Sequence, residues 1–148
     1  MAALRLVLDT NVLISAALSG QGAPAQLLRT VLAEHQLVFS EATFLELRTR
    51  IDRPKFDRYI SLEIRQRMLH DLDACAHWVD LGLGANKPPS PPSYCRDPDD
   101  DWFIATALQA QAPLLVSGDQ DLLDAPLVSG LLILAPAQAL AWLQKQGT

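Results

Sequence analysis

The sequence predicts an α/β fold, a three-layer α/β/α sandwich around a central and mainly parallel sheet. Two patterns predict it: short apolar runs without polar alternation, typical of strands buried on both faces, and longer segments with helical apolar spacing between them. The length of 148 residues suits a single domain, residues 1–148, with a core of ordinary size. Alternation of this kind favours parallel pairing with right-handed crossovers.

Five short apolar runs are the expected strands. Each is bounded by polar or turn-forming residues, and each is too short for a helix. They are Leu4–Leu8, Leu37–Phe39, Trp78–Val79, Leu114–Val116 and Leu131–Leu134.

The segments between these runs carry apolar residues at helical spacing. The expected helices are Ala25–Glu34, Glu41–Ile51, Leu62–Ala76, Trp102–Ala112 and Ala137–Gln144. Pro24 suits the first turn of the first helix, and Pro54 marks a break between the second and the third. Val12–Leu18 is better explained as helix core than as a partner surface. Residues 82–98, which contain five prolines, are expected to be an irregular connector within the domain.

Composition and charge exclude several classes of protein. The net charge of −5 argues against a protein that binds polyanions through bulk charge, although local charge or a bound metal can override that sum. The N-terminal apolar run stops at Asp9, too early for a secretion signal, and no run is long enough to cross a membrane. Cys75 and Cys95 form no CxxC pair, so we expect reduced thiols in a cytoplasmic protein.

Acidic residues gather where expected strands end. Asp9 ends the first run, and Asp119 and Asp121 follow the fourth. A further group, just before the helix expected at Trp102, consists of Asp97, Asp99, Asp100 and Asp101. Because the carboxyl ends of parallel strands meet at one edge of a sheet, we expect these acids to point to the same edge.

Each of these acids by itself is better explained as a helix cap. Four aspartates within five residues, however, exceed what capping requires. If Asp9, Asp101 and Asp119 converge, their repulsion calls for a hard divalent cation such as Mg²⁺ or Mn²⁺. The lack of a His/Cys cluster disfavours zinc, and no Gly-rich phosphate loop is present. Glu46 lies in mid-helix between two leucines, and its exposure is left open by the pattern.

Four acidic motifs follow one another along nearly the whole chain. They are Leu8–Ile14, Ser40–Leu47 with Arg53–Phe56, Arg96–Ala105, and Val116–Leu123. In this order they resemble the motifs of PIN domains, metal-dependent ribonucleases that commonly serve as the toxin of bacterial toxin–antitoxin pairs. Leu132–Pro136 is similar to the last strand and helix of that family.

The resemblance implies four catalytic, metal-binding carboxylates and one auxiliary metal ligand. The four are Asp9, Glu46, Asp101 and Asp119, and the auxiliary ligand is Asp121. Asp99 and Asp100 stay open as alternatives to Asp101.

The resemblance also implies supporting groups and a reaction. Thr10, Asn11 and Ser117 would hold the remaining lone pairs of the carboxylates or position water. The reaction would be in-line hydrolysis of an RNA phosphodiester by water, assisted by Mg²⁺ or Mn²⁺, with Asp9 as the central ligand and no covalent intermediate.

Seven of the 12 basic residues fall between positions 48 and 67. They form either a solvated face paired with nearby acids or a rim that contacts RNA phosphates, with Tyr59 or Phe56 available to stack on bases. The candidate RNA-binding residues are Arg48, Arg50, Arg53 and Lys55.

Three other functions stay open at this point. The first is a catalytically silent PIN-like module that binds or regulates, and the second is a plain α/β domain whose aspartates are caps. The third is a receiver-type phosphoacceptor domain, which is disfavoured because no lysine occurs between Lys87 and Lys145. From the resemblance we also expect an antitoxin protein as partner and a homodimer, and no membrane association.

Overall fold

A computed structural model of the chain describes residues 3–82, 101–124 and 130–146. Within these residues five parallel strands form one sheet in the order β3-β2-β1-β4-β5. The strands are β1 (Arg5–Leu8), β2 (Gln36–Phe39), β3 (His77–Trp78), β4 (Leu114–Val116) and β5 (Leu132–Leu134). The α/β class and the central parallel sheet are therefore confirmed, and each strand overlaps an apolar run of the sequence, although β3 shares only Trp78 with the predicted run.

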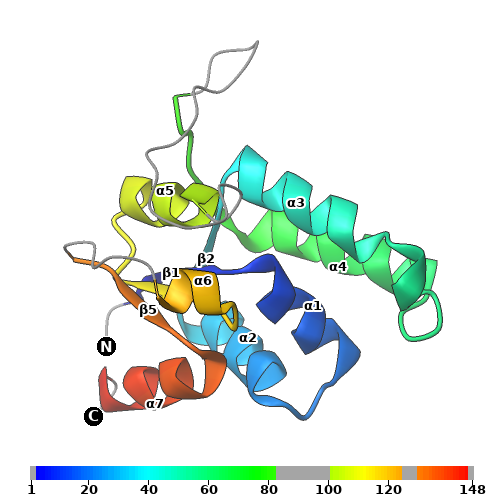
Figure 1. Cartoon of the computed structure of the whole chain (residues 1–148), viewed down its shortest axis with the longest axis horizontal. Helices are drawn as coiled ribbons and strands as arrows, with labels where there is room; N and C mark the ends of the chain where they lie inside the picture. The colour runs from blue at the N-terminus through cyan, green and yellow to red at the C-terminus, as the bar shows by residue number, and fades with distance from the viewer. Residues whose placement is uncertain (1–2, 83–100, 125–129, 147–148) are drawn as a thin grey trace.

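Helices cover both faces of this sheet (Figure 1). They are α1 (Thr10–Leu18), α2 (Ala23–Glu34), α3 (Glu41–Ile51), α4 (Leu62–Cys75), α5 (Asp101–Gln109), α6 (Gln120–Leu123) and α7 (Pro136–Gln146), and the short 3₁₀ helix η1 (Pro54–Phe56) follows α3.

The pleat of the central strand divides the core into two parts. Leu6 and Leu8 of β1 belong to the larger cluster, which contains buried residues of α1, α2, α3 and α7. Val7 faces the other way and packs in a second cluster with Phe103 and Ile104 of α5. Because successive strand residues point to opposite faces, a continuous apolar run fills both layers at once. The result is the three-layer sandwich.

Local sequence explains most helix boundaries, with small differences from the expected ones. Ser40 begins α3 with a reciprocal capping box, in which its hydroxyl accepts from the Thr43 N–H and its own N–H donates to the Thr43 hydroxyl. The helix α5 ends at Gln109 rather than at Ala112, because Gln111 adopts a positive φ of 55° and Pro113 follows. The short helices η1 and α6 were not expected, since three or four residues are too few to show a period.

Some expectations fall outside the described residues. Nearly all of the proline-rich connector at 82–98 lies there, as do Cys95, Asp97, Asp99 and Asp100. Within the described part of the chain, no helix has the length and apolar character needed to cross a membrane.

Candidate functional site

The site lies where the order of the strands reverses. From β1 the chain builds β2 and β3 on one side, and it returns to the other side of β1 for β4 and β5. In open parallel sheets, ligands bind beyond the carboxyl ends of the strands at such a switch point. Asp9 directly follows β1, and its N–H continues the ladder by donating to the Val116 carbonyl at 2.9 Å. The residues that follow β1 and β4 are therefore neighbours at this edge.

Asp9 is a buried carboxylate, only 2% exposed. It occupies the N-cap position of α1, yet its side chain makes no capping hydrogen bond. Instead its Oδ2 accepts a hydrogen bond of 2.7 Å from the hydroxyl of Ser117, which is fully buried. The short hydrogen bond of Asp9 is thus made with Ser117 and not with the start of α1, so capping alone does not explain why an aspartate stands here.

Burial raises the pKa of Asp9, and the negative charge of Asp119 raises this pKa further. Three groups act in the opposite sense on the same pKa: the Ser117 hydroxyl, the Asn11 N–H and the positive charge of Arg50. Asp9 is thus held near a second acid in a place where its charge is only partly compensated.

Asp119 has two roles in the structure. Its side chain caps α6, because Oδ1 accepts from the Asp121 N–H at 2.9 Å, as the capping interpretation expects. Its own N–H donates to the Ser117 hydroxyl at 2.9 Å. One buried serine therefore connects Asp9 with Asp119, and a residue predicted to bind the metal also caps a helix.

Glu46 lies half-buried on α3, which answers the question that its sequence position left open. Its Oε2 accepts from the Thr10 hydroxyl at 3.2 Å, and its Oε1 lies 2.7 Å from Nη2 of Arg50. The structure thus brings Glu46 next to the residue that follows Asp9. The ion pair with Arg50 was not foreseen, although the Glu-x-x-x-Arg spacing on a helix is a known signal for such a pair.

The other site residues expected from the sequence are placed as follows. Asp101 is the first residue of α5 and is buried, and α5 packs against β1, β2 and β4. Asp121 is half-buried, and the side chain of Asn11 is exposed. Asp99 and Asp100, the alternatives to Asp101, lie outside the described residues.

These donors match a hard cation in chemistry, since carboxylate and hydroxyl oxygens are what Mg²⁺ and Mn²⁺ prefer. Among residues 3–82, 101–124 and 130–146, however, no three His, Cys, Asp or Glu side chains are close enough together to hold an ion. The set Asp9, Glu46, Asp101 and Asp119 therefore stays a prediction.

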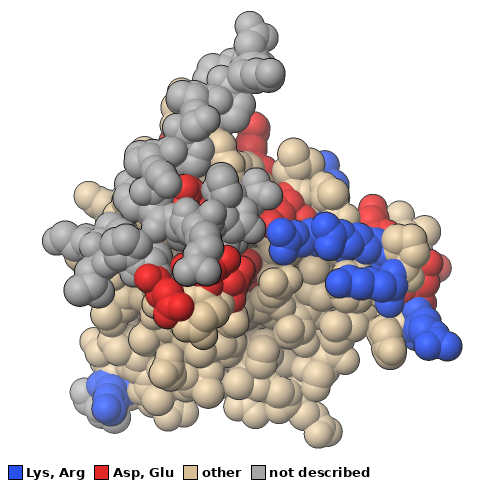
Figure 2. Space-filling view, viewed as in Figure 1, with Lys and Arg blue, Asp and Glu red and all other residues tan. Residues whose placement is uncertain are grey.

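Basic side chains form a band over α3 and the segment after it, beside a patch of acidic side chains (Figure 2). Arg48 lies over the Phe44 ring at 5.3 Å and Lys55 over the Phe56 ring at 5.1 Å. Arg53 is exposed. These three cations present charge to solvent along one side of the molecule.

Arg65 does not belong to this band, although it falls within the basic stretch of the sequence. It is 4% exposed, its Nη2 lies 2.8 Å from the Asp57 carboxylate, and its Nε donates to the Ile60 carbonyl. It fixes the start of α4, so the expected pairing with a nearby acid is found here, although the side chain is buried and not part of a solvated face.

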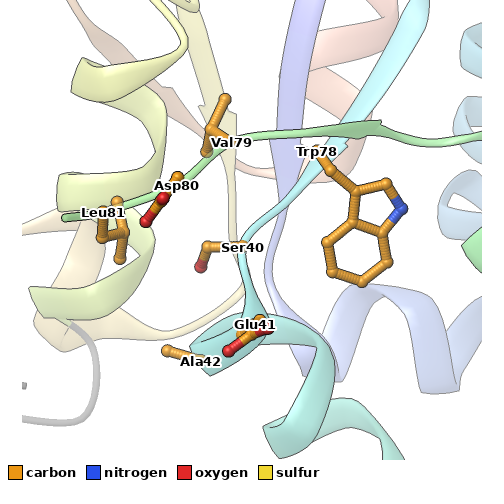
Figure 3. A pocket seen from close by; sticks show the side chains of 7 residues that line it. All are labelled: Ser40, Glu41, Ala42, Trp78, Val79, Asp80 and Leu81. Atoms are coloured by element: carbon orange, nitrogen blue, oxygen red, sulfur yellow. The ribbon is translucent and has the colours of Figure 1, made fainter. Parts of the chain in front are cut away.

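Two hollows adjoin Trp78, which the sequence did not single out as a surface residue. One of about 420 Å³ lies between the start of α3 and the chain that continues from β3 (Figure 3). The other, of about 520 Å³, lies over α3 and shares Glu41 and Trp78 with the first. Trp78 is held by stacking on Phe44, with ring centroids 5.2 Å apart, and by an N–H bond to the Asp73 carbonyl. None of the four expected catalytic acids lines either hollow.

Comparison with known proteins places the chain in a family. Residues 5–121 match the PIN domain family. The chain is also similar to the uncharacterized protein MJ1680 of Methanocaldococcus jannaschii, with 31% identity over 122 residues, 82% of this chain and 74% of that protein.

Solved structures share the fold. VapBC2 from Rickettsia felis bound to a DNA fragment from its promoter has 14% identity and a TM-score of 0.57, covering 88% of this chain and 97% of that chain. FitAcB from Neisseria gonorrhoeae has 18% identity and a TM-score of 0.52, covering 89% and 98%. FitAB bound to an IR36 DNA fragment has 19% identity and a TM-score of 0.51, covering 88% and 94%. At these identities the likeness concerns the fold.

Proposed function

The chain belongs to the PIN domain family, and on that premise we propose that it is an endoribonuclease that needs Mg²⁺ or Mn²⁺ to hydrolyse RNA phosphodiester bonds. The observation that carries the proposal is Asp9: a buried carboxylate whose short hydrogen bond goes to Ser117, beside Asp119 at the switch point of the sheet. Burying a carboxylate costs free energy, and groups with raised pKa values of this kind concentrate at functional sites.

The residues of the proposed metal site would have different roles. Asp9, Glu46, Asp101 and Asp119 would hold the cation, with Asp121 as an auxiliary ligand. When bound, the cation would act as a Lewis acid, which makes water a better nucleophile and stabilises the leaving oxygen. Ser117 orients Asp9 through its 2.7 Å hydrogen bond, and Thr10 orients Glu46 through its hydroxyl.

The basic band is the proposed path of the RNA strand. Exposed cations attract the phosphates of the RNA, so the strand can reach the acidic site along the band with less repulsion from the carboxylates. Tyr59, which is 69% exposed, is the better candidate for stacking on a base, because Lys55 lies over the ring of the half-buried Phe56.

The first test is cleavage of single-stranded RNA by the full-length protein in Mn²⁺, in Mg²⁺ and in chelator. We expect Asp9→Asn to abolish cleavage while the circular dichroism spectrum stays that of the wild type. Asp124→Asn, a change of the exposed acid at the end of α6, is the matched control and should keep wild-type activity. Wild-type cleavage by the Asp9 variant would contradict the assignment. If the wild-type protein cleaves no RNA in Mn²⁺ or Mg²⁺, a catalytically silent binding module would be favoured.

Asp119→Asn separates capping from catalysis in the same assay. Asparagine caps helices about as well as aspartate, so α6 should keep its stability. The charge is lost, however, and cleavage should fall with it. A variant that cleaves RNA normally would leave Asp119 as a cap alone.

We further propose that the protein is the toxin of a toxin–antitoxin pair and acts in the cytoplasm, where its RNA target is. Its motifs resemble those of PIN toxins, and the solved structures that share its fold include those of VapBC2, FitAcB and FitAB, two of them bound to DNA fragments. These neighbours support an antitoxin partner that binds DNA. Expression of the chain should arrest growth, and co-expression of a small DNA-binding protein encoded beside it should relieve the arrest and co-purify.

We also propose that the protein forms a homodimer, because its motifs resemble those of PIN domains. Leu62 and Ile64 on α4 expose large apolar side chains, and such groups favour a protein contact. Analytical ultracentrifugation should show a dimer that Leu62→Glu weakens.

A further inference from the structure

Arg50 is one helical turn from Glu46 on α3, and the two side chains form an ion pair of 2.7 Å. Pairs of this spacing on an exposed helix contribute little. Here both side chains are partly withdrawn from water, with 26% of Arg50 and 18% of Glu46 exposed. The carboxylate that Arg50 holds is also one of the expected metal ligands. Arg50 therefore places a positive charge at the site itself.

Both oxygens of Glu46 have donors, and the two donors differ in kind. The Thr10 hydroxyl lies 3.2 Å from Oε2 and carries no charge, so it can stay in place when a cation binds. The Arg50 guanidinium lies on Oε1. A guanidinium and a divalent cation on one carboxylate repel each other, so Arg50 competes directly with the metal.

The charge of Arg50 also reaches the buried acid at the end of β1. It lowers the pKa of Asp9, against the larger effect of burial and the negative charge of Asp119. Arg50 thus compensates at least two of the carboxylates that a divalent cation would compensate.

We propose that Arg50 is a built-in counter-cation of this site, which holds Glu46 while no metal is bound and has to release it before Mg²⁺ or Mn²⁺ can bind there. The inference rests on the proposed metal site. It adds that metal binding exchanges one cation, Arg50, for another. Arg50 therefore lowers the affinity of the site for the metal, and it stabilises the metal-free protein.

Calorimetric titration of the full-length protein with Mn²⁺ tests this exchange. Arg50→Gln should bind Mn²⁺ about five- to tenfold more tightly than the wild type, because a competing charge is gone. A residue that merely supported the fold or positioned Glu46 would give the opposite result, weaker binding. Arg67→Gln is the control, since Arg67 is exposed on α4 and lies outside the candidate RNA-binding residues; the affinity of this variant for Mn²⁺ should equal that of the wild type.

Thermal unfolding supplies a second readout. In chelator, Arg50→Gln should have a lower Tm than the wild type, and saturating Mn²⁺ should raise its Tm by more than it raises that of the wild type. Arg50→Lys keeps the charge and should stay close to the wild type in both measurements. In a Glu46→Gln background, removal of Arg50 should no longer tighten Mn²⁺ binding.

The outcomes separate this inference from the proposed function. A wild type that binds Mn²⁺ and an Arg50→Gln variant that binds it equally or less tightly would overturn the inference and leave the proposed function standing. If neither protein binds Mn²⁺ and neither cleaves RNA, the proposed function falls, and the counter-cation role falls with it.

Discussion

At the scale of single residues, the Asp9 carboxylate is held in a position that is unfavourable for its negative charge. The carboxylate is buried, and its pKa is raised by burial and by the charge of Asp119. An acid whose pKa is higher in the folded than in the unfolded chain stabilises the fold at low pH, and that contribution is lost as the pH rises through the folded pKa. Near neutral pH and without metal, a charged Asp9 therefore destabilises the fold.

Asp9→Asn should consequently be more stable than the wild type in chelator at neutral pH. We expect its Tm to be about 2–4 °C higher, which corresponds to roughly 1 kcal/mol in a domain of this size. At a pH below the ordinary pKa of an aspartate, the carboxyl is protonated in both the folded and the unfolded chain, and the difference should shrink. Differential scanning calorimetry at the two pH values checks this. A variant less stable than the wild type at neutral pH would show that the ionised carboxylate supports the fold.

At the scale of elements, α3 links the core to the site. Its N-cap Ser40 is buried, forms the capping box with Thr43 and lies 2.8 Å from the Thr106 hydroxyl of α5. The same helix carries Glu46 and Arg50. The position of these two side chains therefore depends on how firmly the start of α3 is fixed to its neighbour.

Ser40→Ala should lower the free energy of unfolding by about 2 kcal/mol, because it removes a cap and leaves a buried hydroxyl of Thr106 with one partner fewer. Ser61→Ala is the comparison: Ser61 caps α4 through the Ile64 N–H, but at an exposed position. There we expect a loss of about 0.5–1 kcal/mol. Urea unfolding monitored by circular dichroism measures both. Equal losses would mean that the contact with α5 contributes nothing beyond the cap.

At the scale of the whole molecule, charge is segregated rather than spread. The net charge of −5 is that of an acidic protein, yet basic side chains form a continuous band beside an acidic patch (Figure 2). A polyanion that follows the band meets positive charge, although the protein as a whole is acidic. The sum of charges is thus a poor guide to what this surface attracts.

Reversal of two charges in the band should weaken RNA binding and its dependence on salt. For Arg53→Glu with Lys55→Glu, we expect the slope of log K against log salt to fall by about 1.4, from two lost phosphate contacts on a single strand. Binding is measured by fluorescence anisotropy in chelator, which prevents cleavage. Arg29→Glu with Lys145→Glu, on α2 and α7, changes the net charge equally and should keep the slope. An unchanged slope in the first variant would remove the band from the RNA path.

Much of the fold could be predicted because its determinants are local. The apolar runs overlap all five described strands, and Glu41–Ile51 was predicted with both boundaries correct, since Ser40 and the apolar spacing of that helix are visible in the sequence. Of the site, the sequence predicts which acids follow strands. It could not predict that Arg65 is buried while Arg53 is exposed, because both lie in one basic stretch.

The sequence by itself determined the elements of this protein, its α/β class and the acids at its strand ends, because periodicity, caps and chain breaks act over a few residues. Only the tertiary structure decided that β1 lies between β2 and β4, so that Asp9 meets Ser117 and Asp119. It also decided that Thr10 reaches Glu46 across 36 residues of chain, next to Arg50. Contacts of this kind depend on how the layers pack, and no local pattern encodes them.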